Sequence, residues 1–212
     1  MKKYSLIFCL FLPIFAAAQI EEPQFDHKVE ENTDENKILD NMQRRFGAQL
    51  LLGFNASQVE QDRMEGFHKF AFNGGVRGLV IWTPKFSTSI DLLYSQKGSQ
   101  RAVLDDPILS RIDLDYVEIP VMAQYRDWRF QFSAGLAYNR LINFKVLDFN
   151  HNDVTDNYSP RVNNVYWAVG GTLFITKKWG LNVLYEQSIL SVLENGAWNR
   201  NLHWTARAVY QL

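Results

Sequence analysis

The 212-residue sequence has one cysteine, six prolines and no excess of either charge sign. Cys9 lies so close to the N-terminus that the rest of the chain has neither a disulfide nor thiol chemistry. Lysine and arginine total 22 against 23 aspartates and glutamates, which excludes the basic surface of a nucleic-acid-binding protein. The few prolines, together with 14% aromatic residues, favour a chain rich in β-strands. The mean hydropathy of −0.23 does not exclude a membrane, because barrel strands alternate polar and apolar residues.

The N-terminal segment has the layout of an export signal. Lys2 and Lys3 are followed by an apolar run from about Leu6 to Phe15 and then by three alanines. This order predicts a secretory signal peptide over residues 1–18, cleaved after Ala18. The alternative, a membrane anchor, needs a longer run, because a helix must cross about 30 Å of hydrocarbon.

Residues 19–45 differ in composition from the rest of the chain. The stretch EEPQFDHKVEENTDENK is acidic, poor in large apolar side chains and without strand periodicity. Such a segment buries too little surface to offset the entropy lost on ordering. We expect a flexible periplasmic arm, which acts either as a plain linker or as a docking segment for a partner.

From residue 46 onward, apolar and polar residues alternate with the period of two that is typical of β-strands. The alternation indicates eight strands, at about 46–55, 70–82, 86–95, 117–125, 128–139, 165–175, 179–185 and 202–212. Pro120 is a difficulty in the fourth strand because it cannot donate a ladder hydrogen bond, so we expect a bulge or weak pairing there. The predicted fold class is all-β, an eight-stranded antiparallel up-and-down transmembrane β-barrel over residues 46–212.

Three patterns favour a membrane barrel over a water-soluble sandwich. The apolar faces carry no charge, which at mid-bilayer would cost about 2–4 kcal/mol. Aromatic residues gather at both ends of those faces, as in the interfacial girdles of membrane barrels. One girdle comprises Trp82, Phe86, Tyr125, Trp128, Trp179 and Tyr210, and the other comprises Tyr94, Tyr138, Trp167, Tyr185 and Trp204.

The third pattern is the length of the turns. Links near Pro84, Asp127 and Lys177 are short, whereas those around 57–66, 98–112 and 142–161 are long. Outer-membrane barrels have short periplasmic turns and long outer loops. The pattern therefore predicts an outer-membrane protein in contact with lipid, with both termini in the periplasm.

An eight-stranded barrel has an interior just wide enough for side chains, so inward charges must pair with one another. Counting outward from the turn at Pro84 places Arg77 directly opposite Asp91. The remaining inward charges are Glu118, Glu186 and Arg207, with Arg129 as a further candidate. We expect a structural salt-bridge network, and a gated proton or ion path is the alternative.

The stretch from Glu194 to Ala197 (ENGA) is a type I′ hairpin signal. Pairing its two ends sets Ser188 opposite His203 and Glu186 opposite Thr205, with Arg207 one diagonal step from Glu186. Ser188, His203 and Glu186 are thus candidates for a nucleophile, a base and an orienting acid. Their lumenal position argues against an enzyme that acts on lipid.

No cofactor is expected. His27, His68 and His151 lack metal-ligand spacing, and the loop DFNHNDVTDN lacks the glycine and closing glutamate of a calcium loop. We therefore expect no metal site.

Three stretches carry a family resemblance: IDLLYSQKGSQR from Ile90, LDYVEIPVMAQY from Leu114 and AGLAYNRLI from Ala134. They resemble PorT-like outer-membrane β-barrel proteins of Bacteroidota over nearly all of residues 46–212. The resemblance implies an integral barrel without enzymatic activity, in an envelope complex linked to type IX protein secretion. The partners would be other envelope proteins, bound through the outer loops or the N-terminal arm. An outer-membrane lipid-modifying enzyme with the Ser188, His203 and Glu186 set is the alternative.

Overall fold

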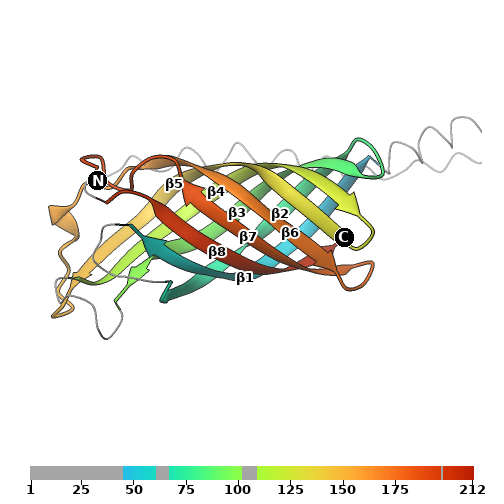
Figure 1. Ribbon diagram of the computed structural model, residues 1–212. Helices are drawn as coiled ribbons and strands as arrows, with labels where there is room; N and C mark the ends of the chain where they lie inside the picture. Colours follow the sequence, from blue (N-terminus) through green and yellow to red (C-terminus); the bar gives the residue numbers. More distant parts are fainter. Residues whose placement is uncertain (1–44, 61–66, 102–108, 197) are drawn as a thin grey trace, which may run out of the picture. The chain divides into compact units, whose positions relative to one another are not determined.

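The computed structural model describes residues 45–60, 67–101, 109–196 and 198–212. They form a closed antiparallel barrel in which each strand pairs with the next in the chain and β8 pairs with β1 (Figure 1). The eight-stranded barrel predicted from the sequence is confirmed. The predicted signal peptide and nearly all of the predicted arm lie outside the described residues. The strands are β1 (Phe46–Val59), β2 (Lys69–Ile81), β3 (Phe86–Gln100), β4 (Leu109–Asp127), β5 (Phe130–Asp148), β6 (Asn163–Phe174), β7 (Trp179–Ser188) and β8 (Asn201–Gln211).

The distribution of polarity is inverted relative to a water-soluble protein. Along β1, Leu52 and Phe54 are more than 60% exposed, whereas Asn55, which faces the interior of the barrel, is fully buried. The same alternation runs through the other strands, so the outer surface is apolar and the interior is polar. This arrangement suits hydrocarbon outside the barrel, since buried polar groups satisfy one another within. No helix among the described residues is long and apolar enough to cross a membrane.

The short connections lie at one end of the barrel, together with the C-terminus (Figure 1). They comprise residues 82–85, 128–129 and 175–178. Trp128, expected as the first residue of the fifth strand, instead lies in a two-residue turn with φ of +52°. Its side chain is 76% exposed at this end of the barrel, the end to which the sequence assigned it.

The strands β4 and β5 extend far beyond their predicted limits. Each has 19 residues, so much of the ranges 98–112 and 142–161, expected as loops, belongs to strands or to a 3-10 helix (Thr155–Asn157). The strands predicted from the sequence end where the outward-facing residues become charged, as at Asp115 and Arg140. Those positions mark where the wall leaves the apolar zone, not where the strand ends.

Pro120 lies inside β4, where it interrupts one ladder. The β3–β4 ladder pairs Ile90 with Val121 and Leu93 with Glu118, but the two intervening positions are unpaired. The register is the same on both sides, so no residue is inserted and the irregularity is weak pairing. On its other edge, Pro120 lies opposite Ala137 of β5.

The end of the barrel with the long connections is closed by an apolar cluster. Side chains from β1, β4 and β5 pack there with the segment that joins β7 to β8. Trp198 from that segment lies against Tyr158, with ring centres 4.7 Å apart. The cluster comprises Val59, Leu109, Ile112, Leu114, Tyr116, Val146, Val192, Leu193 and Trp198.

Candidate functional site

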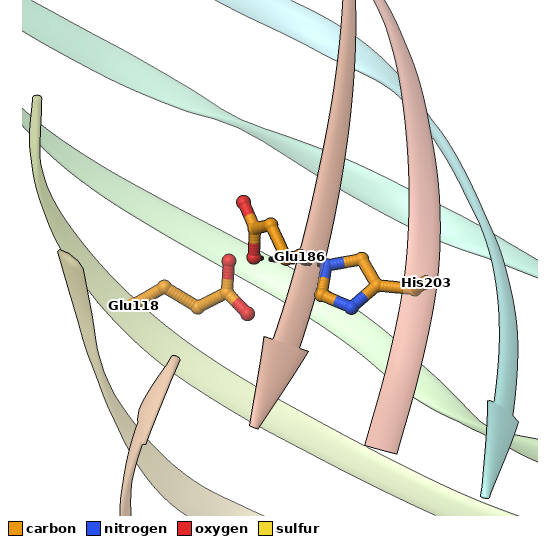
Figure 2. Close-up of side chains that lie close together, drawn as sticks. All are labelled: Glu118, Glu186 and His203. Atoms are coloured by element: carbon orange, nitrogen blue, oxygen red, sulfur yellow. Dashed lines mark ion pairs between the residues drawn. The ribbon is translucent and has the colours of Figure 1, made fainter. Parts of the chain in front are cut away.

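A cluster of four ionisable side chains crosses the lumen below this apolar cluster. Lys97 of β3, Glu118 of β4, Glu186 of β7 and His203 of β8 all point inward, and each is at most 1% exposed. Figure 2 shows the two carboxylates and the imidazole turned toward one another from three strands. We call these four residues the lumen cluster.

The Lys97 ammonium joins the two carboxylates of the lumen cluster. Its Nζ atom forms an ion pair with Oε1 of Glu118 and lies 3.5 Å from Oε2 of Glu186. The same Oε2 atom is 2.9 Å from Nε2 of His203. Lys97 also lies over the ring of Tyr166, 4.0 Å from its centre, where the aromatic face attracts a cation. A buried charge without partners is very costly, so these contacts are what allow the cluster to exist.

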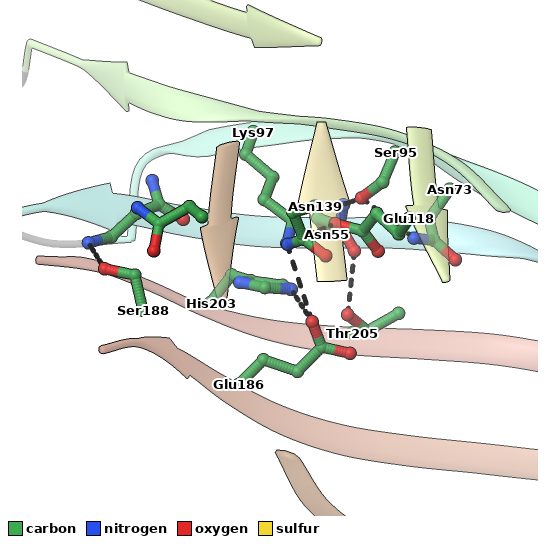
Figure 3. A network of polar contacts seen from close by, with 12 residues as sticks. Asn55, Asn73, Ser95, Lys97, Glu118, Asn139, Glu186, Ser188, His203 and Thr205 are labelled. Atoms are coloured by element: carbon green, nitrogen blue, oxygen red, sulfur yellow. Dashed lines mark hydrogen bonds and ion pairs between the residues drawn. The ribbon is translucent and has the colours of Figure 1, made fainter. Parts of the chain in front are cut away.

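Amide and hydroxyl groups extend this network around the lumen wall (Figure 3). The side-chain nitrogen of Asn55 donates to Oγ of Ser95 at 2.8 Å, and Thr205 donates to Oδ1 of Asn55 at 2.8 Å. Asn139 donates to Oε1 of Glu118 at 3.2 Å. Hydrogen bonds from neutral groups stabilise a buried carboxylate without adding charge.

A second group of ions, Arg77 and Asp91, lies deeper in the barrel. The two residues are direct cross-strand neighbours, as counting from the turn at Pro84 predicts. Two parallel hydrogen bonds join them, Nε to Oδ1 and Nη2 to Oδ2, both at 2.8 Å. This bidentate geometry is the strongest form of an arginine–carboxylate contact.

Arg207 lies opposite Asn182, not beside Glu186 as expected. Its Nε and Nη2 atoms donate to Oδ1 of Asn182 at 3.1 and 3.0 Å, and Nη1 lies 3.4 Å from Oδ1 of Asn73. The expected ion pairing of Arg207 is therefore replaced by hydrogen bonds to neutral amides.

The β7–β8 register predicted from the hairpin signal was wrong by two residues. Glu186 pairs with His203, not with Thr205, and Thr205 pairs with Leu184. The β7–β8 ladder ends at Gln187, and the chain stays bonded to β6 beyond that point, with the N–H of Ile189 donating to the carbonyl of Val165. The connection from β7 to β8 is therefore longer than the predicted hairpin, and the local turn at Gly196 lies within it.

Sequence reasoning missed Lys97 and offered Arg129 in its place. Arg129 lies in the exposed turn before β5, 5.2 Å from the ring centre of Trp128. Lys97 continues the inward series of Asp91 and Ser95, and that alternation was the signal available. It was overlooked because the third strand was expected to end at residue 95.

The three catalytic candidates do not form a relay. The hydroxyl of Ser188 accepts a hydrogen bond from the N–H of Asn201 at 2.9 Å. His203 contacts Glu186, and its Nδ1 atom has no hydrogen-bond partner among the described residues. A nucleophile needs a base within hydrogen-bond reach, and here the serine is bonded to the backbone.

Glu118, Glu186 and His203 offer donor atoms that all lie within 4.8 Å of one another. Two carboxylates and an imidazole are suitable ligands for a transition metal. The Lys97 ammonium contacts both carboxylates and supplies the positive charge that such an ion would bring. Spacing along the sequence did not predict this group, because its members come from three strands.

The closed barrel, with its apolar exterior and polar interior, defines the class: an outer-membrane β-barrel protein. The chain belongs to the family described as outer membrane protein beta-barrel domain, whose model matches residues 18–194. No curated protein matches the chain in sequence.

Several solved structures are similar to this chain. The attachment invasion locus protein Ail of Yersinia pestis is 14% identical, covering 78% of this chain and 99% of its own, with a TM-score of 0.48. Neisserial surface protein A is 11% identical over 79% and 97%, with a TM-score of 0.47. The outer membrane protein OprG of Pseudomonas aeruginosa is 10% identical over 78% and 96%, with a TM-score of 0.41.

Proposed function

We propose that this barrel is a non-enzymatic accessory or scaffold subunit of an envelope complex. The observation that carries the proposal is the filled lumen, in which the lumen cluster and the Arg77–Asp91 pair occupy the interior. Eight strands leave no room for an open channel beside such side chains. A filled barrel acts through surfaces outside the membrane.

Two surfaces are available for partners under this proposal. The first is the wall of β4 and β5 that projects beyond the girdle, with the segments packed on its apolar cluster. The second is the acidic arm over residues 19–45, which remains after cleavage of a signal peptide over residues 1–18. Short turns in the periplasm and long connections outside would put both termini and the arm in the periplasm.

The finer assignment is to a PorT-like role in type IX protein secretion in Bacteroidota. Its support is the resemblance of the stretches that begin at Ile90, Leu114 and Ala134. In the barrel these stretches belong to β3, β4 and β5, and the last two of these strands build the projecting wall. A partner shared with a secretion complex would bind this wall or the arm.

Copurification from gently solubilised membranes tests the proposal. The tagged full-length protein is expected to retain at least one envelope protein in fixed stoichiometry. Deleting residues 21–40 should release a partner bound to the arm, whereas replacing residues 149–153 with glycine and serine should release one bound to the projecting wall. A barrel that elutes alone in every mild detergent would refute a scaffold role.

The alternative of a lipid-modifying enzyme gains no support from the site. Ser188, Glu186 and His203 are all buried within the lumen, away from the lipid-facing surface. The direct check is lipid analysis of membranes that contain Ser188→Ala. The control is Ser133→Ala, which removes a hydroxyl from outside the candidate set. A change in lipid acylation or lipid headgroup that occurs with Ser188→Ala but not with Ser133→Ala would favour the enzyme.

A further inference from the structure

The β2–β3 ladder stops before either strand ends. Its last pair toward the long connections is Asn73 with Ser95, so residues 69–72 of β2 and 96–100 of β3 do not pair. Each strand continues to pair with its other neighbour, β1 and β4 respectively. The wall therefore has a gap between two strand edges, which we call the β2–β3 notch.

Side chains satisfy the backbone groups that the notch leaves unpaired. From inside the barrel, Asn55 donates to the carbonyl of Gln96 at 2.8 Å and Ser57 donates to that of Gly98 at 2.9 Å. The side-chain oxygen of Gln96 accepts from the N–H of Phe72 at 3.4 Å. Exposed strand edges without partners are a liability, so these bonds indicate a notch built into the wall.

Lys69 crosses the notch to reach β4. Its Nζ atom donates to the carbonyl of Ile112 at 2.6 Å and forms an ion pair with Asp113. Gly98 permits the crossing: a Cβ there would lie 2.9 Å from the ammonium and 2.1 Å from the Ile112 carbonyl, and its φ is +126°. Only glycine adopts that backbone at low cost.

A polar cleft of about 210 Å³ opens beside the notch on the outer wall. Three cationic side chains (Lys69, Arg111 and Lys145) and two acidic ones (Asp113 and Asp115) line it, leaving one positive charge in excess. Asp113 is already paired with Lys69 and with Nε of Arg111 at 2.8 Å. Lys145 forms a long ion pair with Asp153, with Nζ 3.9 Å from Oδ2. The side chains of Arg111 and Lys145 are both about half exposed, so each can turn toward a ligand.

The cleft begins where the apolar wall ends. On β3, Gln96 follows the girdle residue Tyr94 on the same face and donates to its hydroxyl at 3.1 Å. Phe70, 76% exposed, lies at the rim of the cleft. Because interfacial aromatics mark the depth of lipid headgroups, the ligand nearest to this cleft is a headgroup.

We propose that the cleft binds the phosphorylated sugar headgroup of a membrane glycolipid. Arg111 and Lys145 contact the phosphate, since a guanidinium fork matches phosphate oxygens and an ammonium adds charge. Asp115, which accepts from Asn143 at 3.0 Å, contacts sugar hydroxyls together with that amide. The volume is below the roughly 300–1,000 Å³ of sites that enclose drug-sized ligands, so one part of a headgroup fits and its acyl chains stay in the bilayer. Binding to the cleft does not depend on the proposed function; only the placement of the cleft at the outer leaflet does, because it rests on the orientation proposed there, with the short turns in the periplasm.

The test is binding of lipid A to the mature protein refolded in neutral detergent. Removing both cations in Arg111→Gln/Lys145→Gln should weaken binding by at least about tenfold. The matched control is Lys85→Gln/Lys178→Gln, which removes the same charge at the opposite end of the barrel and should change binding by less than about twofold. Heat-modifiable migration on detergent gels verifies that each variant is folded.

Two further ligands make the result decisive. Dephosphorylated lipid A should bind the unmodified protein as weakly as lipid A binds the Arg111/Lys145 variant. Glucosamine phosphate without acyl chains should not compete at comparable concentration. Equal loss in the control variant would overturn the proposal, as would equal binding of the dephosphorylated lipid, and tight binding of the soluble sugar would overturn the lipid source. No envelope partner is present, so this result is independent of the copurification test.

Discussion

The two groups of buried ions in the lumen differ in how far apart their members lie in the chain. Arg77 and Asp91 are 14 residues apart and face each other across one hairpin. Lys97 and Glu186 are 89 residues apart and meet only because the sheet closes into a barrel. The first contact is set by one tight turn, and the second by the whole topology.

The two groups also differ in how their charges are balanced. Arg77 and Asp91 form a one-to-one bidentate pair, which can be formed or removed as a unit. In the lumen cluster a single ammonium serves two carboxylates, and a histidine completes the contacts of one. Losing the shared cation, Lys97, should therefore be more damaging than losing either member of the pair.

The largest expected effect follows the removal of Lys97. Lys97→Met leaves two carboxylates buried without their shared cation, and we expect a loss at or above the upper end of the ~3–5 kcal/mol typical of a broken buried pair. The measurement is urea unfolding in detergent or lipid. Lys178→Met, at the exposed short-turn end, is the control. A loss no greater than the control would mean that the lumen cluster contributes little to stability.

A double-mutant cycle on Arg77 and Asp91 should show a smaller and recoverable loss. We expect about 3–4 kcal/mol for Arg77→Met or Asp91→Asn alone and much less than their sum for both together, because the double variant buries no unpaired charge. The same unfolding assay applies. Strictly additive losses would show that the pair does not act as a unit and would remove the contrast with the lumen cluster.

Replacing His203 should cost less than replacing either cation. In His203→Gln the amide keeps a donor for Glu186, so we expect about 1–3 kcal/mol, the cost of a weakened hydrogen bond to a charged group. Ser188→Ala, which removes only a hydroxyl bonded to the backbone, should cost about 1 kcal/mol. If Ser188→Ala were the more damaging of the two, the order of importance in the lumen would be reversed.

The smallest effect concerns the connection between β5 and β6, outside the membrane. The hydroxyl and N–H of Thr155 hold the pKa of Asp153 below its usual value by hydrogen bonds to its carboxylate. A lowered pKa means that the stabilisation is present near neutral pH and is lost as the pH falls below about 4. Amide exchange at Thr155 should rise in Asp153→Asn at neutral pH, with the lumen strands unchanged. Exchange that spreads to β5 would show that the loop and the barrel are not independent.

Much of the barrel was predictable because period-two alternation reports directly on which side chains face lipid. Leu52 and Phe132 face outward as predicted, and the pair of Arg77 with Asp91 follows from the short turn at Pro84. Alternation persists through charged stretches such as Arg111 to Asp115, but the apolar signal stops there. The projecting parts of β4 and β5 were missed for that reason.

Glu118 and Glu186 were expected to face the lumen, but the contacts within the lumen cluster could not be predicted because they cross the barrel. A register error of two residues in the β7–β8 hairpin was enough to move Glu186 from His203 to Thr205. Local turn propensity at Gly196 gave no warning that the preceding residues bond to β6. To predict a contact between distant strands, the register of every strand pair between them must be known. A single register error therefore makes the predicted contact wrong.

Closure of the barrel has a consequence for the order of assembly. The first and last strands meet in a ladder from Gln49–Gln211 to Val59–Asn201, and Thr205 bonds to Asn55 across 150 residues. Until β8 docks, Glu186 lacks its histidine and Asn55 lacks its hydroxyl donor. Contacts of such high sequence separation form late, after the local hairpins. The polar contacts of the interior therefore stabilise only the closed barrel. Open, partly inserted chains are disfavoured, and folding in the membrane is strongly cooperative.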